Sequence, residues 1–196
     1  MRKEKLEELQ SYIEELKVKK QELLEGYGKF LTSKRYMIEL NNGEKFIREK
    51  LVKNGEDGNA CIILPVTTED NVILVVQPRV FTKDTVAVEL PAGYVDGEED
   101  YEVAARRELL EETGYVPQEM IHLGSFYQDQ GCSGAYNKAY LATNCTRIGE
   151  QNLDRDEFIH YFECSYDEML ELVDRGMIQD AQSQLVIERS KQYRRK

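Results

Sequence analysis

The chain has 196 residues and a formal net charge of −11, which is enough sequence for one domain with a small appendage. The negative charge argues against a nucleic-acid backbone as a partner, because the summed field repels phosphates. No segment approaches the roughly 20 apolar residues that a membrane-spanning helix needs. The opening residues MRKEKLEELQ lack the apolar core of a signal peptide, and the four cysteines are widely spaced. We therefore expect a cytoplasmic protein with reduced thiols and no membrane partner.

Residues 1–28 predict an N-terminal helix followed by a glycine stop. Leucine and isoleucine recur at three- and four-residue intervals over residues 1–25, with lysine and glutamate on the remaining faces. Gly26 and Gly28 are expected to end this helix. The apolar stripe suits two uses, a dimer seam or a contact with the surface of the chain's own domain.

Residues 29–56 predict a β-hairpin. The segment KRYMIELNNGEKFIREKLV alternates apolar and polar side chains on both sides of Asn41-Asn42-Gly43. An Asn-Gly pair between two alternating runs is a strong short-range hairpin signal. We expect the turn at these three residues and one strand on each side of it.

Residues 57–196 predict an α+β domain. The strand-like runs are NACIILPVT, NVILVVQPR, AVEL, MIHLGSFYQ, NKAYLATNC and FIHYFEC. Helices are expected at 100–113, ended by Gly114, at 165–176, opened by a capping box of Ser165 and Glu168, and at 180–193. Because strands and helices do not alternate regularly, the pattern indicates a sandwich-like α+β domain.

The first of these helices is strongly acidic. It gathers Glu108, Glu111 and Glu112 within one turn, where like charges repel. Arg107 stands four residues before Glu111 and can pair with it, and Glu99 is within its reach. Glu108 and Glu112 share one face, and two carboxylates converging from one side form a hard oxygen site suited to Mg²⁺ or Mn²⁺. A solvated acidic helix face is the alternative at this point.

A defined spacing runs through this stretch, G-x5-E-x7-R-E-U-x-E-E-x-G-U, where U is apolar. Only Tyr115 departs from it, at a position where an aliphatic residue is usual, and the rest is in register: Gly93, Glu99, Arg107, Glu108, Leu109, Glu111, Glu112 and Gly114. The spacing resembles the Nudix box, and the surrounding elements are similar to the Nudix α/β/α sandwich. The resemblance implies hydrolysis of the pyrophosphate bond in a nucleoside diphosphate linked to another moiety, with Mg²⁺, or Mn²⁺ in its place.

Four further segments resemble the ADP-ribose pyrophosphatase branch of that family: ELPAG before the box, VVQPR, LDRDEFI and RGMIQDAQS. This resemblance covers roughly residues 45–196. It implies ADP-ribose as the substrate, with AMP and ribose 5-phosphate as products. One departure from the branch leaves the identity of the substrate's sugar undetermined, since YQDQGCSGAYN stands where the branch usually has a proline-containing loop. The alternatives are another nucleotide sugar as the substrate, or a nucleotide-sensing module without turnover.

The resemblance also assigns roles to individual residues. It implies one set of metal ligands, of which the first acts through its carbonyl oxygen: Ala92, Glu108, Glu111, Glu112 and Glu157. Glu111 and Glu157 are also candidates for a direct part in catalysis, and Arg107 is a candidate for orienting the carboxylates. Substrate binding falls to Arg79 and, across a dimer interface, to Arg48. For each arginine, a surface salt bridge is the alternative.

Three other chemically reactive residues are expected to be structural. His122 and His160 stand in strand-like runs, without a His or Cys partner at ligand spacing. Cys132 lies in a glycine-flanked loop, and no His/Asp arrangement marks it as a nucleophile.

The resemblance further implies a C2 homodimer, because N-terminal strands in that branch swap between subunits and complete the adenine pocket. In this chain the hairpin has an apolar alternation, which needs a partner surface to bury it: Tyr36, Ile38, Leu40 and Phe46. We expect residues 29–56 to be the dimerisation region. The stripe of the N-terminal helix is the alternative seam, through Leu9, Ile13 and Leu16.

Overall fold

The computed structural model describes residues 1–24 and 28–194. Its elements, in chain order, are α1 Lys3–Leu16, β1 Leu31–Glu39, β2 Lys45–Lys53, β3 Ala60–Thr67, β4 Asn71–Pro78, β5 Val86–Glu89, β6 Ala92–Tyr94, α2 Tyr101–Thr113, β7 Tyr115–Val116, β8 Glu119–Tyr127, β9 Tyr136–Arg147, β10 His160–Ser165, α3 Tyr166–Asp174 and α4 Ala181–Arg194. Each predicted strand and helix of residues 57–196 is therefore present, and two short strands, β6 and β7, were not predicted. Within the described residues, no helix is long and apolar enough to cross a membrane.

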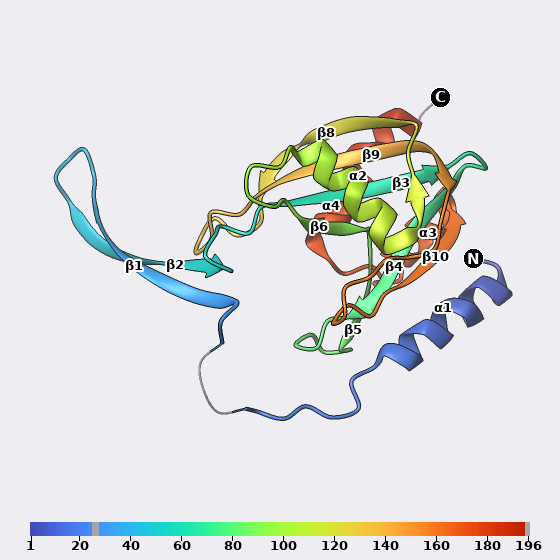
Figure 1. Cartoon of the computed structure of the whole chain (residues 1–196), viewed down its shortest axis with the longest axis horizontal. Helices are drawn as coiled ribbons and strands as arrows, with labels where there is room; N and C mark the ends of the chain where they lie inside the picture. Colours follow the sequence, from blue (N-terminus) through green and yellow to red (C-terminus); the bar gives the residue numbers. More distant parts are fainter. Residues whose placement is uncertain (25–27, 195–196) are drawn as a thin grey trace.

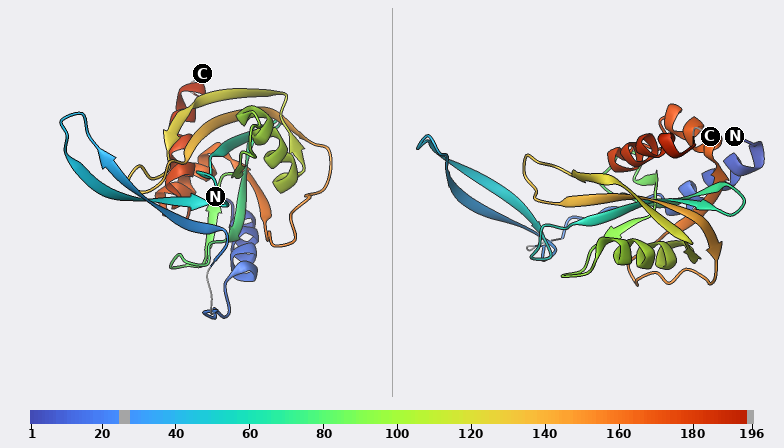
Figure 2. Two further views of the ribbon diagram at one scale, coloured as in Figure 1. Left: turned by 60° about the vertical axis from the view of Figure 1, so that its left-hand side comes forward. Right: turned by 90° about the horizontal axis from the view of Figure 1, so that it is seen from above.

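A central mixed sheet carries the domain (Figure 1). Its order is β10-β4-β3-β9-β7, and β5, β6 and β8 pair with β4, β3 and β9. The β3–β9 pair is parallel and the other pairs are antiparallel. In the view from above in Figure 2, α2 covers one face of the sheet, while α3 and α4 cover the other.

The two faces of the sheet bury two separate hydrophobic clusters, because side chains alternate along each strand. On β3, Ile62 and Leu64 point to the cluster shared with α1, α3 and α4. Cys61 and Ile63 point to the other face, where Leu109 of α2 covers them. This arrangement is the predicted α/β/α sandwich of the α+β class.

Local signals in the sequence fix both ends of α2 and the start of α3. The side chain of Asp100 caps α2 by accepting from the backbone N–H of Glu102. Gly114 ends α2 with φ 77°, and a Cβ there would lie 2.3 Å from the carbonyl oxygen of Gly149, so only glycine fits. Ser165 and Glu168 form the predicted capping box.

The N-terminal helix is shorter than predicted, because α1 ends at Leu16 and not near residue 25. After Leu16 the chain is extended and bonds to the loop between β4 and β5: the N–H of Val18 donates to Thr85 Oγ1 at 3.1 Å, and the side-chain amide of Gln21 donates to the carbonyl oxygen of Val80. These tertiary contacts replace the last predicted turns of the helix. The predicted stop at Gly26 lies outside the described residues.

The helix α1 packs against the chain's own domain. Leu9 is fully buried in the cluster with α3 and α4, and Ile13 and Leu16 pack against the same cluster. The amino group of Met1 forms an ion pair with Glu171. The apolar stripe thus has the second of its two predicted uses, a contact with the chain's own surface.

The predicted β-hairpin is a separate two-stranded sheet that projects from the body (Figures 1 and 2). β1 and β2 pair from Leu31↔Lys53 to Glu39↔Lys45 around the turn at residues 40–44. Every side chain of β1 is exposed except Ile38, which is half-buried. The base of the hairpin is tied to the body through the N–H of Leu51, which donates to the carbonyl oxygen of Cys132 at 2.7 Å.

Candidate active site

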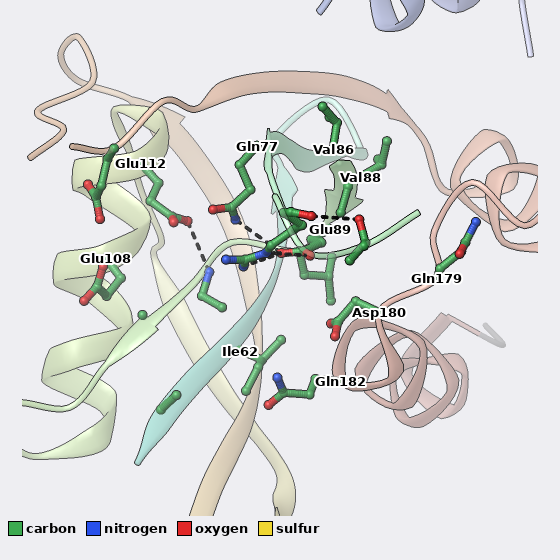
Figure 3. A pocket seen from close by; sticks show the side chains of 18 of the residues that line it. Ile62, Gln77, Val86, Val88, Glu89, Glu108, Glu112, Gln179, Asp180 and Gln182 are labelled. Carbon is green, nitrogen blue, oxygen red and sulfur yellow. Dashed lines mark hydrogen bonds and ion pairs between the residues drawn. The ribbon is translucent and has the colours of Figure 1, made fainter. Parts of the chain in front are cut away.

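A cavity of about 1160 Å³ opens beside α2. Its walls come from α2, β5, β6, the 79–85 loop, the loop around residues 152–157 and the start of α4. Figure 3 shows Glu108 and Glu112 entering from α2, with Asp180 and Gln182 on the opposite side. The volume suits a small-molecule site, and its lining of charged groups suits a polar ligand.

Two turns of α2 hold the predicted carboxylates over the short strand β6. Glu108 and Glu112 lie one turn apart and both line the cavity, together with Glu111. Glu112 is only 4% exposed, and its Oε2 accepts from the backbone N–H of Ala92 at 3.1 Å. The predicted ligands on α2 and on the ELPAG segment are therefore brought together by direct contact.

Arg107 holds this acidic cluster together. Its guanidinium donates to Glu99 at 3.0 and 3.2 Å, to Glu108 at 2.7 Å and to Glu111 at 3.1 Å. It also donates to the carbonyl oxygen of Tyr94 at 3.0 Å. One cation thus offsets three carboxylates and links α2 to β6, which fits the predicted role of orienting carboxylates.

The acidic cluster is largely buried, and its negative charges outnumber the positive charge of Arg107. Burial raises the pKa of Glu112 well above its ordinary range, and the charges of Glu108 and Glu157 raise it further. Burial also raises the pKa of Glu108 to about 7, against the opposing effect of Arg107. The charge of Glu157 contributes to both shifts, so this loop residue faces the same cluster. A bound cation would relieve this repulsion.

The donor set fits a hard divalent ion, since all of the predicted ligands offer oxygen atoms. In the described part of the chain, no three or more His, Cys, Asp or Glu residues already form a group that could hold a metal ion. The predicted ligand set is therefore not preassembled around one ion position among these residues.

Glu157 reaches the cavity from the loop that precedes β10. Its Oε2 accepts from the backbone N–H of Asp154 at 3.0 Å, which closes a tight turn. Glu157 and Asp154 both line the cavity, whereas Asp156 does not. The cavity lining thus leaves two acids of this loop, Asp154 and Glu157, and of these it is Glu157 whose charge acts on Glu108 and Glu112.

Arg79 lies across the cavity at the end of β4. Its guanidinium binds Glu89 at 2.6 and 2.9 Å, and Gln77 donates to the same carboxylate at 3.2 Å. Glu89 is 7% exposed and was not predicted as a site residue. Its signal in the sequence is an acid inside an otherwise apolar strand, VAVEL, which requires a partner.

Comparisons with known proteins identify the family of the chain. The NUDIX domain model matches residues 57–188. This chain belongs to the Nudix family. An ADP-ribose pyrophosphatase of Bacillus subtilis is 34% identical over 152 residues, which cover 77% of this chain and 80% of the relative. A GDP-mannose pyrophosphatase of Salmonella typhimurium is 31% identical over 159 residues, covering 78% and 82% of the two chains.

A solved structure described as an ADP compounds hydrolase shares the fold, with a TM-score of 0.72 at 18% identity over 86% of this chain and 88% of that one. The chain is thus a Nudix hydrolase related to an ADP-ribose pyrophosphatase and to GDP-mannose pyrophosphatases. The predicted family and fold are confirmed.

One predicted site residue lies apart from the others, outside the residues that match the NUDIX domain model. Arg48 is on β2 in the projecting hairpin, with its guanidinium 4.5 Å from the ring centre of Phe46 and donating to the carbonyl oxygen of Ile47 at 3.0 Å. It does not line the cavity of its own chain. Its predicted action on a neighbouring subunit stays a prediction.

Two histidines have structural surroundings. His160 stacks on Tyr12 with ring centres 4.5 Å apart and lies 3.2 Å from the carboxylate of Glu15, so it joins β10 to α1. His122 shares a hydrogen bond with Ser125 at 3.2 Å. Neither of them lines the cavity.

The N-terminal segment is a part of the cavity that sequence reasoning missed. Ile13 and Lys17 line it beside the 79–85 loop. The backbone N–H of Arg79 donates to the carbonyl oxygen of Thr85 at 2.8 Å, and Thr85 in turn accepts from Val18. The segment after α1 therefore supports the loop that carries Arg79. No local pattern in the sequence signals a contact between positions 67 residues apart.

Proposed function

We propose that this Nudix hydrolase cleaves the pyrophosphate bond of a nucleoside diphosphate linked to a second moiety. The leading substrate is ADP-ribose, with AMP and ribose 5-phosphate as products. The observation that carries the proposal is the buried pair Glu108 and Glu112, held against Ala92 and Gly93 with Arg79 across the cavity. The sequence identity of 34% to an ADP-ribose pyrophosphatase supports this choice of substrate.

The carboxylates of the cluster would hold Mg²⁺, with Mn²⁺ as its substitute. The proposed ligands are the carbonyl oxygen of Ala92 and the side chains of four acids, Glu108, Glu111, Glu112 and Glu157. When bound, the ion polarises the phosphoryl oxygens and lowers the pKa of the attacking water. The metal identity is part of the proposal and rests on the hard oxygen donors.

The chain's own residues position the reactants. Arg107 keeps Glu108 and Glu111 oriented through its hydrogen bonds to both. Arg79, itself held by Glu89, offers guanidinium N–H groups to a phosphate or a ribose. Glu157, on its loop beside the cluster, accepts the proton of the attacking water or completes the ligand set. Most of the rate enhancement would come from positioning and charge stabilisation.

A nucleotide-sugar panel tests the function. Purified protein with Mg²⁺ is incubated with ADP-ribose, GDP-mannose and other nucleotide sugars, and a phosphatase converts the monophosphate products to inorganic phosphate. ADP-ribose is expected to give the highest kcat/KM. A clear preference for GDP-mannose would transfer the proposal to that substrate, after which the Salmonella relative is named. Calorimetric binding without phosphate release from any compound would identify a sensing module.

We further propose a C2 homodimer formed through the hairpin at residues 29–56, in which Arg48 reaches the substrate of the neighbouring subunit. The support is the exposure of apolar side chains on a projecting two-stranded sheet, including Met37 at 66% and Ile47 at 42%. A hairpin of this kind is marginal in isolation and gains stability from a partner surface.

A further inference from the structure

Lys53 of the hairpin strand β2 places a positive charge at the edge of the cavity. It is the last residue of β2, at the base of the hairpin, and it lines the cavity. Its backbone is fixed by a reciprocal pair of hydrogen bonds with Glu56, at 2.8 and 3.0 Å. Two residues earlier, the N–H of Leu51 donates to the carbonyl oxygen of Cys132 at 2.7 Å, so this end of β2 is tied to the body of the protein and not only to the projecting tip.

The side chain of Lys53 is held along its length. Nζ donates to Gln128 Oε1 at 3.0 Å and lies 5.4 Å from the ring centre of Tyr94. The stem packs over Gly58, where a Cβ would lie 2.5 Å from Lys53 Cδ. Gly58 also has φ +74°, a conformation that favours glycine, so the backbone leaves room for this stem.

The ammonium group has no carboxylate partner among the residues that the structure describes. Across residues 1–24 and 28–194, no carboxylate lies within ion-pairing distance of Lys53 Nζ, although the same cavity is rich in acids. Burial lowers the pKa of Lys53, and no neighbouring negative charge offsets this effect. A partly desolvated cation that faces an amide and an aromatic ring is ready to accept an anion from solution.

Tyr94 connects Lys53 to the other half of the site. It follows Gly93 in β6, its carbonyl oxygen accepts from Arg107, and its ring lies under Lys53. The positive charge of Arg79 also acts on the Tyr94 hydroxyl, where it opposes the rise in pKa that burial causes. Lys53, Tyr94 and Arg79 all line the same cavity as the acidic cluster, and the charge of Arg79 acts on the residue over which Lys53 lies.

We propose that Lys53 is a second phosphate-binding cation of this cavity, and that it acts with Arg79 on the diphosphate of the substrate. It contacts phosphoryl oxygens on the Tyr94 side, away from those that face the α2 carboxylates. The inference rests on the proposed function and deepens it, because it adds the base of the hairpin to the substrate site.

The test removes the charge and keeps the stem. Lys53→Met retains the packing on Gly58 and Tyr94, and Lys53→Arg restores a cation. Lys3→Met is the control, since Lys3 is exposed on α1, pairs with Glu7 and lies outside both the cavity lining and the hairpin. With ADP-ribose and Mg²⁺, Lys53→Met is expected to raise KM tenfold or more and to change kcat less than threefold. Lys53→Arg should recover most of this loss, and Lys3→Met should resemble the wild type.

Binding of the two reaction products, AMP and ribose 5-phosphate, gives a readout that does not depend on turnover. Calorimetry should show a loss of affinity of at least tenfold for one of them in Lys53→Met. Unchanged KM and unchanged affinity for both would overturn the assignment while leaving the proposed hydrolase intact. A wild-type protein that cleaves nothing on the panel, yet loses product binding in Lys53→Met, would instead overturn the proposed function and keep the phosphate site. Absence of binding in the wild type would overturn the Lys53 assignment itself.

Discussion

The carboxylate of Glu108 occupies the space that a side chain on Gly93 would need. A Cβ at Gly93 would lie 1.9 Å from the carboxyl carbon of Glu108 and 2.2 Å from both of its oxygens. The backbone of Gly93 has no positive φ, so its conformation alone does not demand glycine. The absence of a side chain at Gly93 is what leaves room for the carboxylate of Glu108 beside β6.

The first prediction follows from this contact. Gly93→Ala should force the Glu108 carboxylate away from its place and lower kcat at least tenfold, a barrier change of about 1.4 kcal/mol. The fold should persist, because the displaced group is the end of a side chain at the edge of a cavity. Thermal unfolding and steady-state kinetics of Gly149→Ala provide the control, since a Cβ at Gly149 meets nothing within 4 Å. Wild-type kcat in Gly93→Ala would show that Glu108 need not lie there.

A second prediction concerns the buried carboxylate. Glu112→Gln preserves the shape of the side chain and its contact with Ala92, but it removes a charge that the metal requires. Turnover with Mg²⁺ should fall below a tenth of the wild-type rate, and circular dichroism should be unchanged. Glu150→Gln is the control, because Glu150 is exposed and pairs with Arg147 away from the cavity. A variant that retains more than a tenth of the rate would remove Glu112 from the ligand set.

The raised pKa of Glu108 predicts how the stability of the metal-free protein depends on pH. Its pKa of about 7 in the folded state exceeds the ordinary value of 4.5, so the folded protein binds the extra proton. Protonated Glu108 therefore contributes to the free energy of unfolding; this contribution is complete below about pH 4.5 and is lost as the pH rises through 7. Between pH 5 and 8 in EDTA, wild-type stability should therefore fall relative to Glu108→Gln, by on the order of 2 kcal/mol.

Urea unfolding at both pH values measures this difference, and Mg²⁺ provides the second readout. Mg²⁺ at 100 times its dissociation constant should add roughly 2.7 kcal/mol to the wild type. The variant should gain much less, because one ligand charge is missing. Parallel pH curves for the two proteins would show that Glu108 does not carry the shifted pKa.

The sequence was sufficient where the signal is local and periodic. The apolar run NACIILPVT predicted the strand β3, and the spacing of the acids placed Glu108 and Glu112 on one face of α2. Gly114 predicted the end of that helix correctly, because its conformation and its contact with Gly149 both require glycine. In each case a few neighbouring residues contain the physical reason.

The parts that could not be predicted depend on contacts between distant segments. The apolar stripe of α1 continues to Leu23 in the sequence, but the helix ends at Leu16 because Val18 bonds to Thr85. The three-residue strand β6 is too short to show alternation. Lys53 resembles any lysine of an exposed hairpin until the fold brings it over Tyr94.

A further prediction separates the acids of the loop before β10. Glu157→Gln should lower kcat much more than it raises KM, because its contribution belongs to the transition state. Asp156→Asn, in the same loop but outside the cavity lining, should leave both parameters near wild type. A larger loss in Asp154→Asn than in Glu157→Gln would move the catalytic role to Asp154, which also lines the cavity.

The last prediction concerns the dimer and the shared site. Met37 and Ile47 are direct cross-strand partners on the hairpin and are both exposed. The double variant Met37→Lys/Ile47→Glu removes this apolar pair, while the opposite charges preserve the pairing of the strands. Light scattering should show a dimer for the wild type and the 22.8 kDa monomer for this variant. A monomeric wild type with full activity would defeat the shared-site proposal.

Mixing two inactive variants then decides whether Arg48 acts on the neighbouring subunit. In a heterodimer of Arg48→Ala and Glu112→Gln, an arginine acting across the interface leaves one site with both residues intact. Random exchange should therefore restore about a quarter of the wild-type activity, because about half of the dimers are mixed and each has one complete site. If Arg48 acted within its own chain, neither site of the heterodimer would be complete. Activity of the mixture equal to the average of the separate variants would thus exclude action across the interface.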